Sequence, residues 1–272
     1  MHRRRYLAAL GLTSTVALAG CGDAIDGEPD GPFSNATWRS GDGLDVEMLA
    51  TSHVDAAVDA DGVTLYSAAR TDHDGESEPS PWLPNQTYES SYDLTNERQL
   101  LTQTVTEDDE TEVTELYVTP EEALFRERIG SEVTYDRQSL NGSPGTIEET
   151  MRSDALVGIR VPQESAGDAV VYEGLENWEP TFDGSVEVDG EPAARFASDS
   201  FDGSRLVPGT VETAAATADV LESGFVPRID QQWEGPHDGT TATIAVDIEY
   251  RDRGASVSEP DWAEEARTDT TN

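Results

Sequence analysis

A succession of short segments in which apolar and polar residues alternate, between residues 63 and 139, most constrains what this chain can fold into. Side chains of a β-strand point alternately to its two faces, so this alternation predicts strands with one buried face. Asn, Asp, Glu and Gly separate the segments and favour turns. The pattern predicts consecutive antiparallel strands at residues 63–71, 88–94, 99–106, 113–119, 123–129 and 133–139.

A second group of strands begins near residue 185. The dipeptide Asp189-Gly190 is a strong signal for a two-residue β-hairpin, here joining residues 185–188 to 193–198. Alternation predicts further strands at residues 214–222, 225–233, 241–250 and 255–258.

Two amphipathic helices are predicted, at residues 44–60 and 146–159. Apolar residues recur at roughly helical spacing in the first. Glu148 and Glu149 suit the first turn of the second, where the helix dipole favours negative charge. An antiparallel sheet with one apolar face needs a cover, which these helices can supply. The sequence therefore predicts the α+β class.

The charge balance is extreme. The chain has 17 basic and 56 acidic residues, a formal net charge of −39, and every basic residue is Arg. Such a charge repels itself in dilute buffer, and molar salt screens the repulsion. The composition resembles that of proteins from extreme halophiles. Because phosphate binding needs clusters of Lys or Arg, and none follows Arg5, we expect no nucleic-acid partner.

The N-terminus has the pattern of an export signal. Arg3, Arg4 and Arg5 precede an apolar stretch at residues 7–19. As a helix this stretch spans roughly 20 Å, less than the hydrocarbon core of about 30 Å. We interpret it as a signal peptide rather than a permanent span. Arg3 and Arg4 resemble a twin-arginine export motif, and the general secretory route is the alternative.

The signal ends in Leu18-Ala19-Gly20-Cys21, which resembles the lipobox of lipoproteins. Cys21 is the only Cys, so no disulfide forms within one chain. The resemblance implies cleavage before Cys21 and a lipid on its thiol, which would anchor the chain on the extracellular face of the cell membrane. An ordinary signal with a chance Cys is the alternative. The predicted organisation is a signal peptide at 1–20, a flexible tether at 21–43, a domain at 44–265 and a disordered tail at 266–272.

Two further segments resemble haloarchaeal lipoproteins of unknown function. One is residues 188–196, and the other closes the domain with an aromatic strand, a Gly turn and a V-x-x-P-x-W segment. The positions of this second segment are Tyr250, Gly254, Val257, Pro260 and Trp262.

These lipoproteins look like the LolA/LppX type, a half-open β-barrel made of a curved antiparallel sheet with helices covering its concave face. The resemblance implies this fold for residues 44–265 and a hydrophobic cavity for a lipid or another apolar ligand. Ordinary core packing is the alternative for every residue expected to line the cavity. These residues are Leu65, Leu101, Leu116, Phe125, Tyr135 and Ile159.

The sequence shows no motif of an enzyme. It has no G-x-S-x-G elbow, and a phosphate-binding loop of the GK[ST] kind is impossible without Lys. We therefore expect no catalytic residues, no cofactor and no metal site. Three N-x-[ST] patterns, possible glycosylation sites in predicted tether or loops, begin at Asn35, Asn85 and Asn141. The expected function is binding or carrying a lipid or other hydrophobic ligand, and a structural or interaction module of the cell envelope without a cavity is the alternative.

Overall fold

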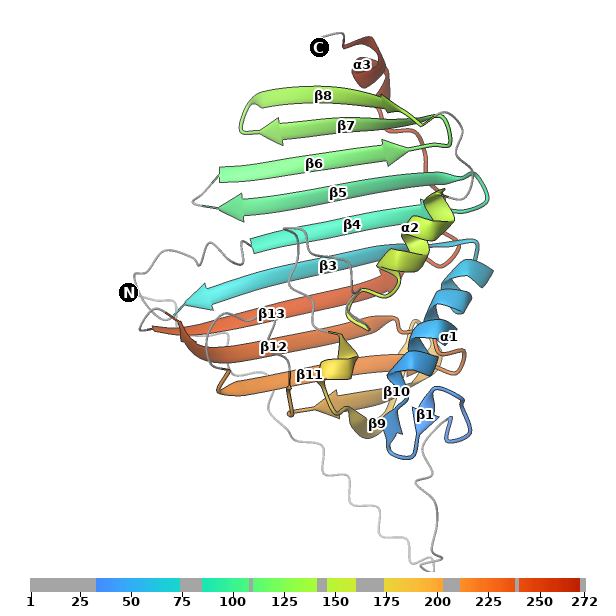
Figure 1. Ribbon diagram of the computed structural model, residues 1–272, viewed down its shortest axis with the longest axis vertical. Coiled ribbons are helices and arrows are strands. Elements are labelled where there is room, and N and C mark those ends of the chain that lie inside the picture. Colours follow the sequence, from blue (N-terminus) through green and yellow to red (C-terminus); the bar gives the residue numbers. More distant parts are fainter. Residues whose placement is uncertain are drawn as a thin grey trace, which may run out of the picture. The chain divides into compact units, whose positions relative to one another are not determined.

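The computed structural model describes residues 33–73, 85–107, 110–140, 146–159, 174–202, 211–237 and 240–269. In these residues, thirteen strands form one sheet in which all neighbours are antiparallel (Figure 1). The strands are β1 (Arg39–Ser40), β2 (Gly43–Leu44), β3 (Gly62–His73), β4 (Asn85–Asp93), β5 (Arg98–Glu107), β6 (Glu110–Val118), β7 (Glu122–Ile129), β8 (Glu132–Ser139), β9 (Thr181–Val188), β10 (Glu191–Ser198), β11 (Thr213–Leu221), β12 (Arg228–His237) and β13 (Thr240–Arg251).

Two meanders make up the sheet. Strands β3 to β8 follow one another on one side, β9 to β13 on the other, and β13 pairs with β3 to join them. The sheet ends at β1 and β8, which do not pair with each other among the described strands, so it is not closed. The strands expected between residues 63 and 139 are confirmed, with ends shifted by up to three residues. The strand expected at 255–258 is wrong, because that segment has no ladder partner in the described chain.

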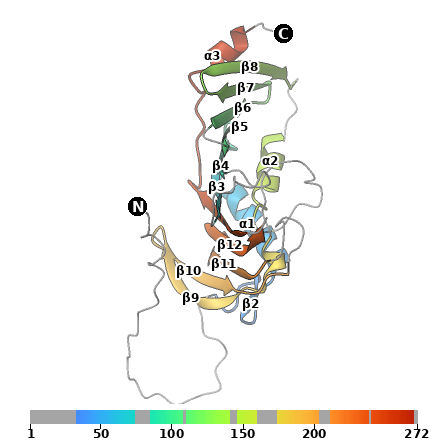
Figure 2. The same ribbon diagram turned by 90° about the vertical axis from the view of Figure 1, so that its left-hand side faces the viewer.

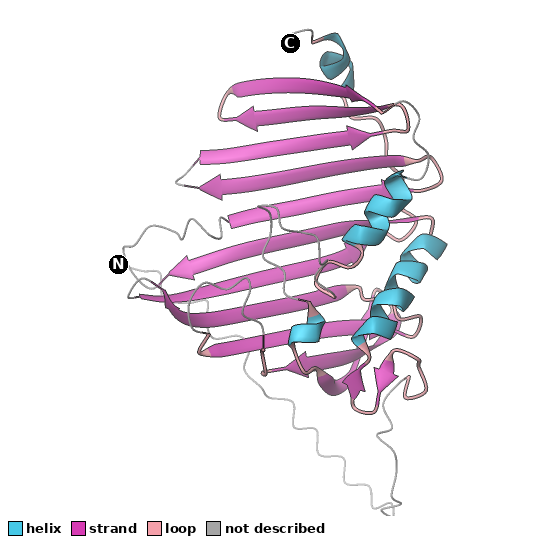
Figure 3. Cartoon of the chain, in the orientation of Figure 1, coloured by secondary structure: helices cyan, strands magenta, loops and turns pink. Residues whose placement is uncertain are grey.

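Four helices accompany the sheet in the described residues (Figure 3). Helix α1 begins after Asp45, whose side chain accepts a hydrogen bond of 3.0 Å from the Met48 N–H and so caps the helix. The predicted helix at 146–159 ends five residues early, at Asp154. None of the described helices is long and apolar enough to cross a membrane. Their bounds are α1 (Val46–Asp59), α2 (Thr146–Asp154), the 3₁₀ helix η1 (Leu175–Asn177) and α3 (Ala263–Thr268).

Helices α1 and α2 lie on the same side of the sheet (Figure 2). We call this side the helix face and the opposite side the back face. The main core fills the space between these two helices and the sheet. It contains Leu49 of α1 and Met151 of α2 together with Leu65 and Ile248 of the sheet. Burial of these side chains supplies roughly 1.5–3 kcal/mol each.

The main core also contains Trp38, which is 1 % exposed and whose indole N–H donates to the Glu222 carbonyl. The predicted tether at 21–43 is therefore wrong at its C-terminal end, since the fold already includes Trp38 and the hairpin β1–β2. Burial of an indole outweighs the turn-rich composition around it. The remainder of the predicted tether before residue 33, like the signal peptide, lies outside the described residues.

A second, smaller core lies on the back face of β6 and β7. The C-terminal strap, defined as residues 252–269, brings Val257, Trp262 and Ala266 onto Tyr117 and Leu124. The tail predicted at 266–272 is therefore wrong for its first residues, because Ala266 is 1 % exposed and helix α3 continues past it. Residues 270–272 lie outside the described chain.

Candidate functional site

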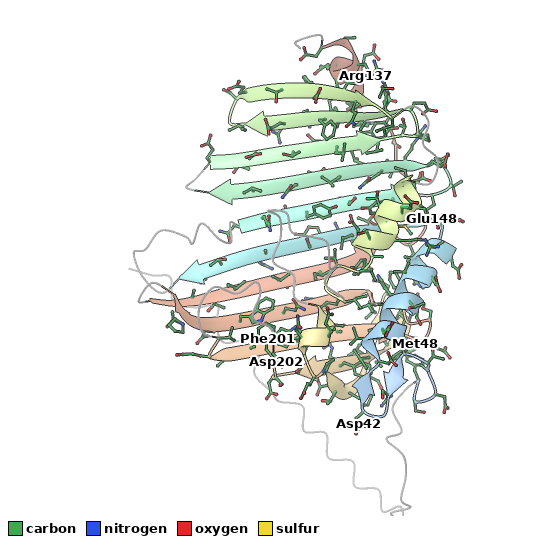
Figure 4. The ribbon with its side chains drawn as sticks, viewed as in Figure 1. Asp42, Met48, Arg137, Glu148, Phe201 and Asp202 are labelled. Atoms are coloured by element: carbon green, nitrogen blue, oxygen red, sulfur yellow. The ribbon has the colours of Figure 1, made fainter. Side chains whose placement is uncertain are left out.

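The helix face is not covered to the same degree along the sheet. On β11 to β13 it is filled by α1, η1 and an aromatic cluster of Trp178, Phe201 and Trp233, with ring centroids 4.8–5.7 Å apart. Phe201 of this cluster is labelled in Figure 4. Both indoles of this cluster are at least 97 % buried. Toward β8 the described helices contribute no comparable cover on this face. The main contacts of α2 with the sheet are on β4, and the half-buried Leu116 and Phe125 pack against the main core. The part of the helix face that the described helices leave largely uncovered is therefore on β5 to β8.

Three apolar side chains lie in register on this uncovered part. Leu101 of β5 is directly opposite Leu116 of β6, which is directly opposite Phe125 of β7. Directly opposite residues share a face and have Cβ atoms about 4.5–5.5 Å apart. All three side chains are only half-buried, whereas Leu65 in the main core is 1 % exposed. We call Leu101, Leu116 and Phe125 the apolar row.

The apolar row is flanked by buried apolar residues on one side and by polar residues on the other. On one side, Val118 and Ala123 are 7 % and 5 % exposed and belong to the main core. On the other side, the next row across the same strands consists of Gln103, Thr114 and Glu127. The apolar row therefore lies between buried apolar residues on the side toward α2 and a row of polar residues on the other side.

A buried polar cluster fixes α2 beside the apolar row. The last residue of α2, Asp154, accepts hydrogen bonds on Oδ2 from the hydroxyls of Tyr88 (2.8 Å) and Tyr92. Gln99 donates to the Tyr92 hydroxyl at 3.2 Å and to the Ser90 hydroxyl at 3.0 Å. Tyr250 donates to the backbone carbonyl of Asp154 at 3.2 Å. We call these residues the Asp154 cluster.

Desolvation controls ionisation in this cluster. Burial raises the pKa of Asp154, although hydrogen bonds from Tyr92 and Tyr88 oppose the shift by stabilising the carboxylate. Burial and the nearby carboxylate raise the pKa of Tyr88 and of Tyr92, so both phenols remain donors. The cluster holds the end of α2 against the sheet.

The six expected cavity residues do not converge on one site. Leu65 and Ile159 are 1 % and 0 % exposed and belong to the main core. Tyr135 is on the back face, where its hydroxyl donates to Glu265 of α3 at 2.5 Å. The residue of β8 that continues the apolar row is instead Asp136, opposite Phe125. The expectation for Tyr135 is wrong because one step along a strand reverses the face, and only Leu101, Leu116 and Phe125 remain together.

The modification sites are placed unequally. Cys21, Arg3, Arg4 and Asn141 lie outside the described residues. Asn35 is exposed in a turn. Asn85 was expected in a loop, but it is the first residue of β4. Its Oδ1 accepts a hydrogen bond of 3.1 Å from the Thr71 N–H.

The sequence pattern did not single out His53 of α1. His53 is 0 % exposed in the main core and accepts a hydrogen bond of 2.9 Å on Nδ1 from the Val226 N–H. Its ring stacks on Phe225 at 4.9 Å and meets Tyr250 at 4.4 Å. Burial lowers the pKa of His53 to about 3, so the ring is neutral. The only sequence signal was its spacing with the apolar residues of α1.

Metal-ligand side chains do not gather in the described chain, where no group of three or more His, Cys, Asp or Glu is placed to hold an ion.

No family model matches the sequence, and no curated protein matches it. Among solved structures, the chain is similar to a LolA superfamily protein from Nitrosomonas europaea at 11% identity, covering 76% of this chain and 94% of that one with a TM-score of 0.22. It is similar to a DUF1329 family protein from Desulfovibrio piger at 11% identity, with coverage of 78% and 95% and a TM-score of 0.24. It is also similar to an outer membrane lipoprotein-sorting protein domain from Vibrio parahaemolyticus at 7% identity, with coverage of 79% and 98% and a TM-score of 0.22. Likenesses at this level do not assign this chain to a family, a ligand or a location.

Proposed function

We propose that the apolar row binds an apolar ligand, such as the acyl chain of a lipid. The observation that carries the proposal is the partial exposure of three in-register apolar side chains, on a sheet face that is filled over β11 to β13. A ligand that covers Leu101, Leu116 and Phe125 gains roughly 25 cal/mol for each Å² of apolar surface removed from water. The polar border at Gln103 and Thr114 suits a ligand with one polar end.

The location is part of the proposal and rests on the sequence. The segment before Cys21 has the features of a lipoprotein signal, which would place the chain outside the cell and attached to the membrane by its lipid. The resemblance to LolA/LppX-type lipoproteins implies that the helix face is the concave face of a half-open barrel. A ligand bound on the apolar row would lie against the sheet beside α2.

The anchor is tested separately from the ligand. Cys21→Ser removes the only thiol, so we expect the chain to leave the membrane fraction and appear in the medium. Retention of the variant in membranes at molar KCl would contradict the anchor and leave the ligand proposal standing.

Ligand binding is tested on the protein purified from membranes in molar KCl. Native mass spectrometry should show bound lipid, and the wild type should enhance the fluorescence of 11-(dansylamino)undecanoic acid. Leu116→Gln places an amide in the apolar row and should weaken binding of the dansyl probe at least tenfold. Val113→Gln is the matched control, because it changes the same strand on the back face. A bare polypeptide mass, together with no probe binding by the wild type, would exclude the proposal.

A structural module of the cell envelope is the second candidate. It is favoured by the burial of Leu65 and Ile159, which fill space that a cavity would need. In that case Leu116→Gln lowers the free energy of unfolding, and neither lipid nor probe is found on the wild type.

A further inference from the structure

The back face has a hollow of its own. A pocket of about 490 Å³ lies over β3, β4, β5, β12 and β13, on the side of the sheet away from α1 and α2. This volume falls within the range of about 300–1,000 Å³ in which small-molecule sites are found. None of the sequence patterns pointed to it. We call it the back-face trough.

Small side chains in register form its floor. Asp247 of β13 is opposite Ala68 of β3, Ala68 is opposite Thr87 of β4, and Thr87 is opposite Thr104 of β5. Because directly opposite residues share a face, the short side chains of Ala68, Thr87 and Thr104 form a shallow depression that runs across the strands. From Asp247 on β13 to Thr104 on β5, three inter-strand spacings make the floor about 14 Å long.

Long side chains on either side of this floor form the walls. Tyr66 and Arg70 are two residues from Ala68 in each direction on β3, and so they point to the same face as Ala68. Glu249 of β13 is opposite Tyr66, and Arg228 of β12 is opposite Glu249. The floor therefore lies between one wall of Tyr66, Glu249 and Arg228 and another that includes Arg70.

Ion pairs hold the walls before any ligand arrives. Arg70 pairs with Asp247, and Arg228 pairs with Asp230 at 2.8 Å. The Arg251 guanidinium lies 4.7 Å from the centroid of the Tyr66 ring. It also pairs with Glu89 at 2.5 Å and with Glu249 at 3.6 Å. Side chains that are already restrained lose less entropy on binding.

The trough lacks the net charge of the molecule around it. Its ionised lining groups are two guanidiniums, Arg70 and Arg228, and two carboxylates, Asp247 and Glu249, in a chain of formal net charge −39. The negative field of the whole chain repels a free anion, and the two arginines in the lining repel a free cation. The lining suits a neutral ligand.

The hydrogen-bonding groups suit a ligand rich in hydroxyls. Carboxylates accept, guanidiniums donate in a planar fork, and the Thr87 and Thr104 hydroxyls do both. The trough crosses strands in the middle of the sheet, where the ladders already use the backbone N–H and C=O groups. An extended peptide, which pairs with a free edge, has no backbone partner here.

We propose that the back-face trough binds a short neutral oligosaccharide. Its hydroxyls accept hydrogen bonds from the two guanidiniums, donate to the two carboxylates and do either with the threonine hydroxyls. A sugar ring covers Ala68 beside the Tyr66 ring. The site lies on the opposite side of the sheet from the apolar row and binds independently of it.

The test is isothermal titration calorimetry of the full chain in molar KCl with maltotriose, cellotriose, mannotriose and triacetylchitotriose as probes. We expect heat with at least one probe and at least a tenfold loss of its affinity in Thr87→Tyr, which fills the floor with a residue favoured in strands. Gln232→Tyr is the matched control, on the same face outside the trough, and should bind like the wild type.

Three results would overturn the proposal. The first is no heat from any of the four probes with a wild type that shows a cooperative thermal transition. The second is unchanged affinity in Thr87→Tyr, which places the sugar elsewhere. The third is tighter binding of a sulfated or phosphorylated trisaccharide than of its neutral parent, which shows that charge recognition dominates. Displacement of the sugar by 11-(dansylamino)undecanoic acid would contradict the independence of the two faces.

Discussion

At the residue scale, two polar side chains organise the main core, the buried His53 and the half-buried Asp154. His53 joins α1 to the segment before β12 through the Val226 N–H, and Asp154 joins α2 to β4 through Tyr88 and Tyr92. Each satisfies a buried donor that would otherwise cost about 1–3 kcal/mol. Both therefore act on stability, and each leads to a prediction.

Burial lowers the pKa of His53 from 6.5 to about 3. Between these values the unfolded chain binds a proton that the folded chain does not, so stability is fully present above pH 6.5 and is lost as the pH falls. We expect the free energy of unfolding to fall between pH 6.5 and 5, at a slope of up to roughly 1.4 kcal/mol per pH unit from this residue. Urea unfolding in molar KCl measures the slope.

The matched variant for this prediction is His53→Asn. The Asn carbonyl oxygen can replace Nδ1 as acceptor for Val226, while the contacts of the ring with Phe225 and Tyr250 are lost. The variant should be less stable at pH 7 and should show a flatter slope between pH 6.5 and 5. Equal slopes for both proteins would mean that His53 is not the group that titrates.

Replacing Asp154 by Asn should reduce the free energy of unfolding less than replacing it by Ala. Asp154→Ala leaves the hydroxyls of Tyr88 and Tyr92 without their acceptor, and we expect a loss of about 1–3 kcal/mol in the free energy of unfolding. Asp154→Asn keeps one oxygen acceptor and should lose less. The comparison is made by urea unfolding, and an alanine variant as stable as the wild type would contradict the role of the cluster.

At the scale of elements, the C-terminal strap covers apolar side chains of the sheet without pairing to it as a strand. It crosses the back face without a ladder and covers Tyr117 and Leu124. Asp93 accepts the Val257 N–H at 3.1 Å, and Arg98 donates to the Val257 carbonyl at 3.4 Å, which fixes the middle of the strap. Its end is held by Arg267, which pairs with Glu122 at 2.7 Å.

Trp262 is the side chain on which the strap depends most. It is 5 % exposed, and the Arg126 guanidinium lies 5.4 Å from its ring centroid. We expect Trp262→Ala to cost about 3–5 kcal/mol in the free energy of unfolding, as for other large-to-small core changes. Trp262→Phe, which keeps an aromatic face for Arg126, is the control and should cost less. Faster amide hydrogen exchange in β7 and β8 of the alanine variant would show that the strap protects them.

At the scale of the whole molecule, the acidic excess exceeds what the described ion pairs can offset. On the back face each of several arginines pairs with a carboxylate, but exposed pairs contribute only about 0–1 kcal/mol each. The formal net charge is −39, so repulsion among unpaired carboxylates remains. Among these arginines are Arg70, Arg126, Arg195, Arg228 and Arg251.

Stability should therefore depend on salt. Lowering KCl from 1 M to 0.1 M lengthens the Debye length from about 3 Å to about 10 Å, which exposes carboxylates to one another. We expect Tm to fall by roughly 2–4 °C for each kcal/mol of added repulsion. Circular dichroism melting across a KCl series measures this, with sucrose at fixed low salt as the control. A Tm that does not change with KCl would contradict the halophile interpretation.

The sequence anticipated local features well. Asp189 and Gly190 adopt positive φ values of 52° and 83°, as the predicted two-residue hairpin turn requires. Alternation also located most strands within a few residues. It did not place Tyr135, because the face of an edge strand depends on pairing with β7. It also did not anticipate the Asp154 cluster, whose members come from α2, β4, β5 and β13.

The sequence by itself determined the antiparallel strands, the helices α1 and α2 and the acidic, lysine-free composition, because these follow from neighbours in the chain. The tertiary structure decided which strands meet. Pairing of β13 with β3 joins residues far apart in sequence and places Asp247 beside Ala68. The back-face trough, the partial exposure of the apolar row and the docking of the strap all depend on that register, which only non-local packing fixes.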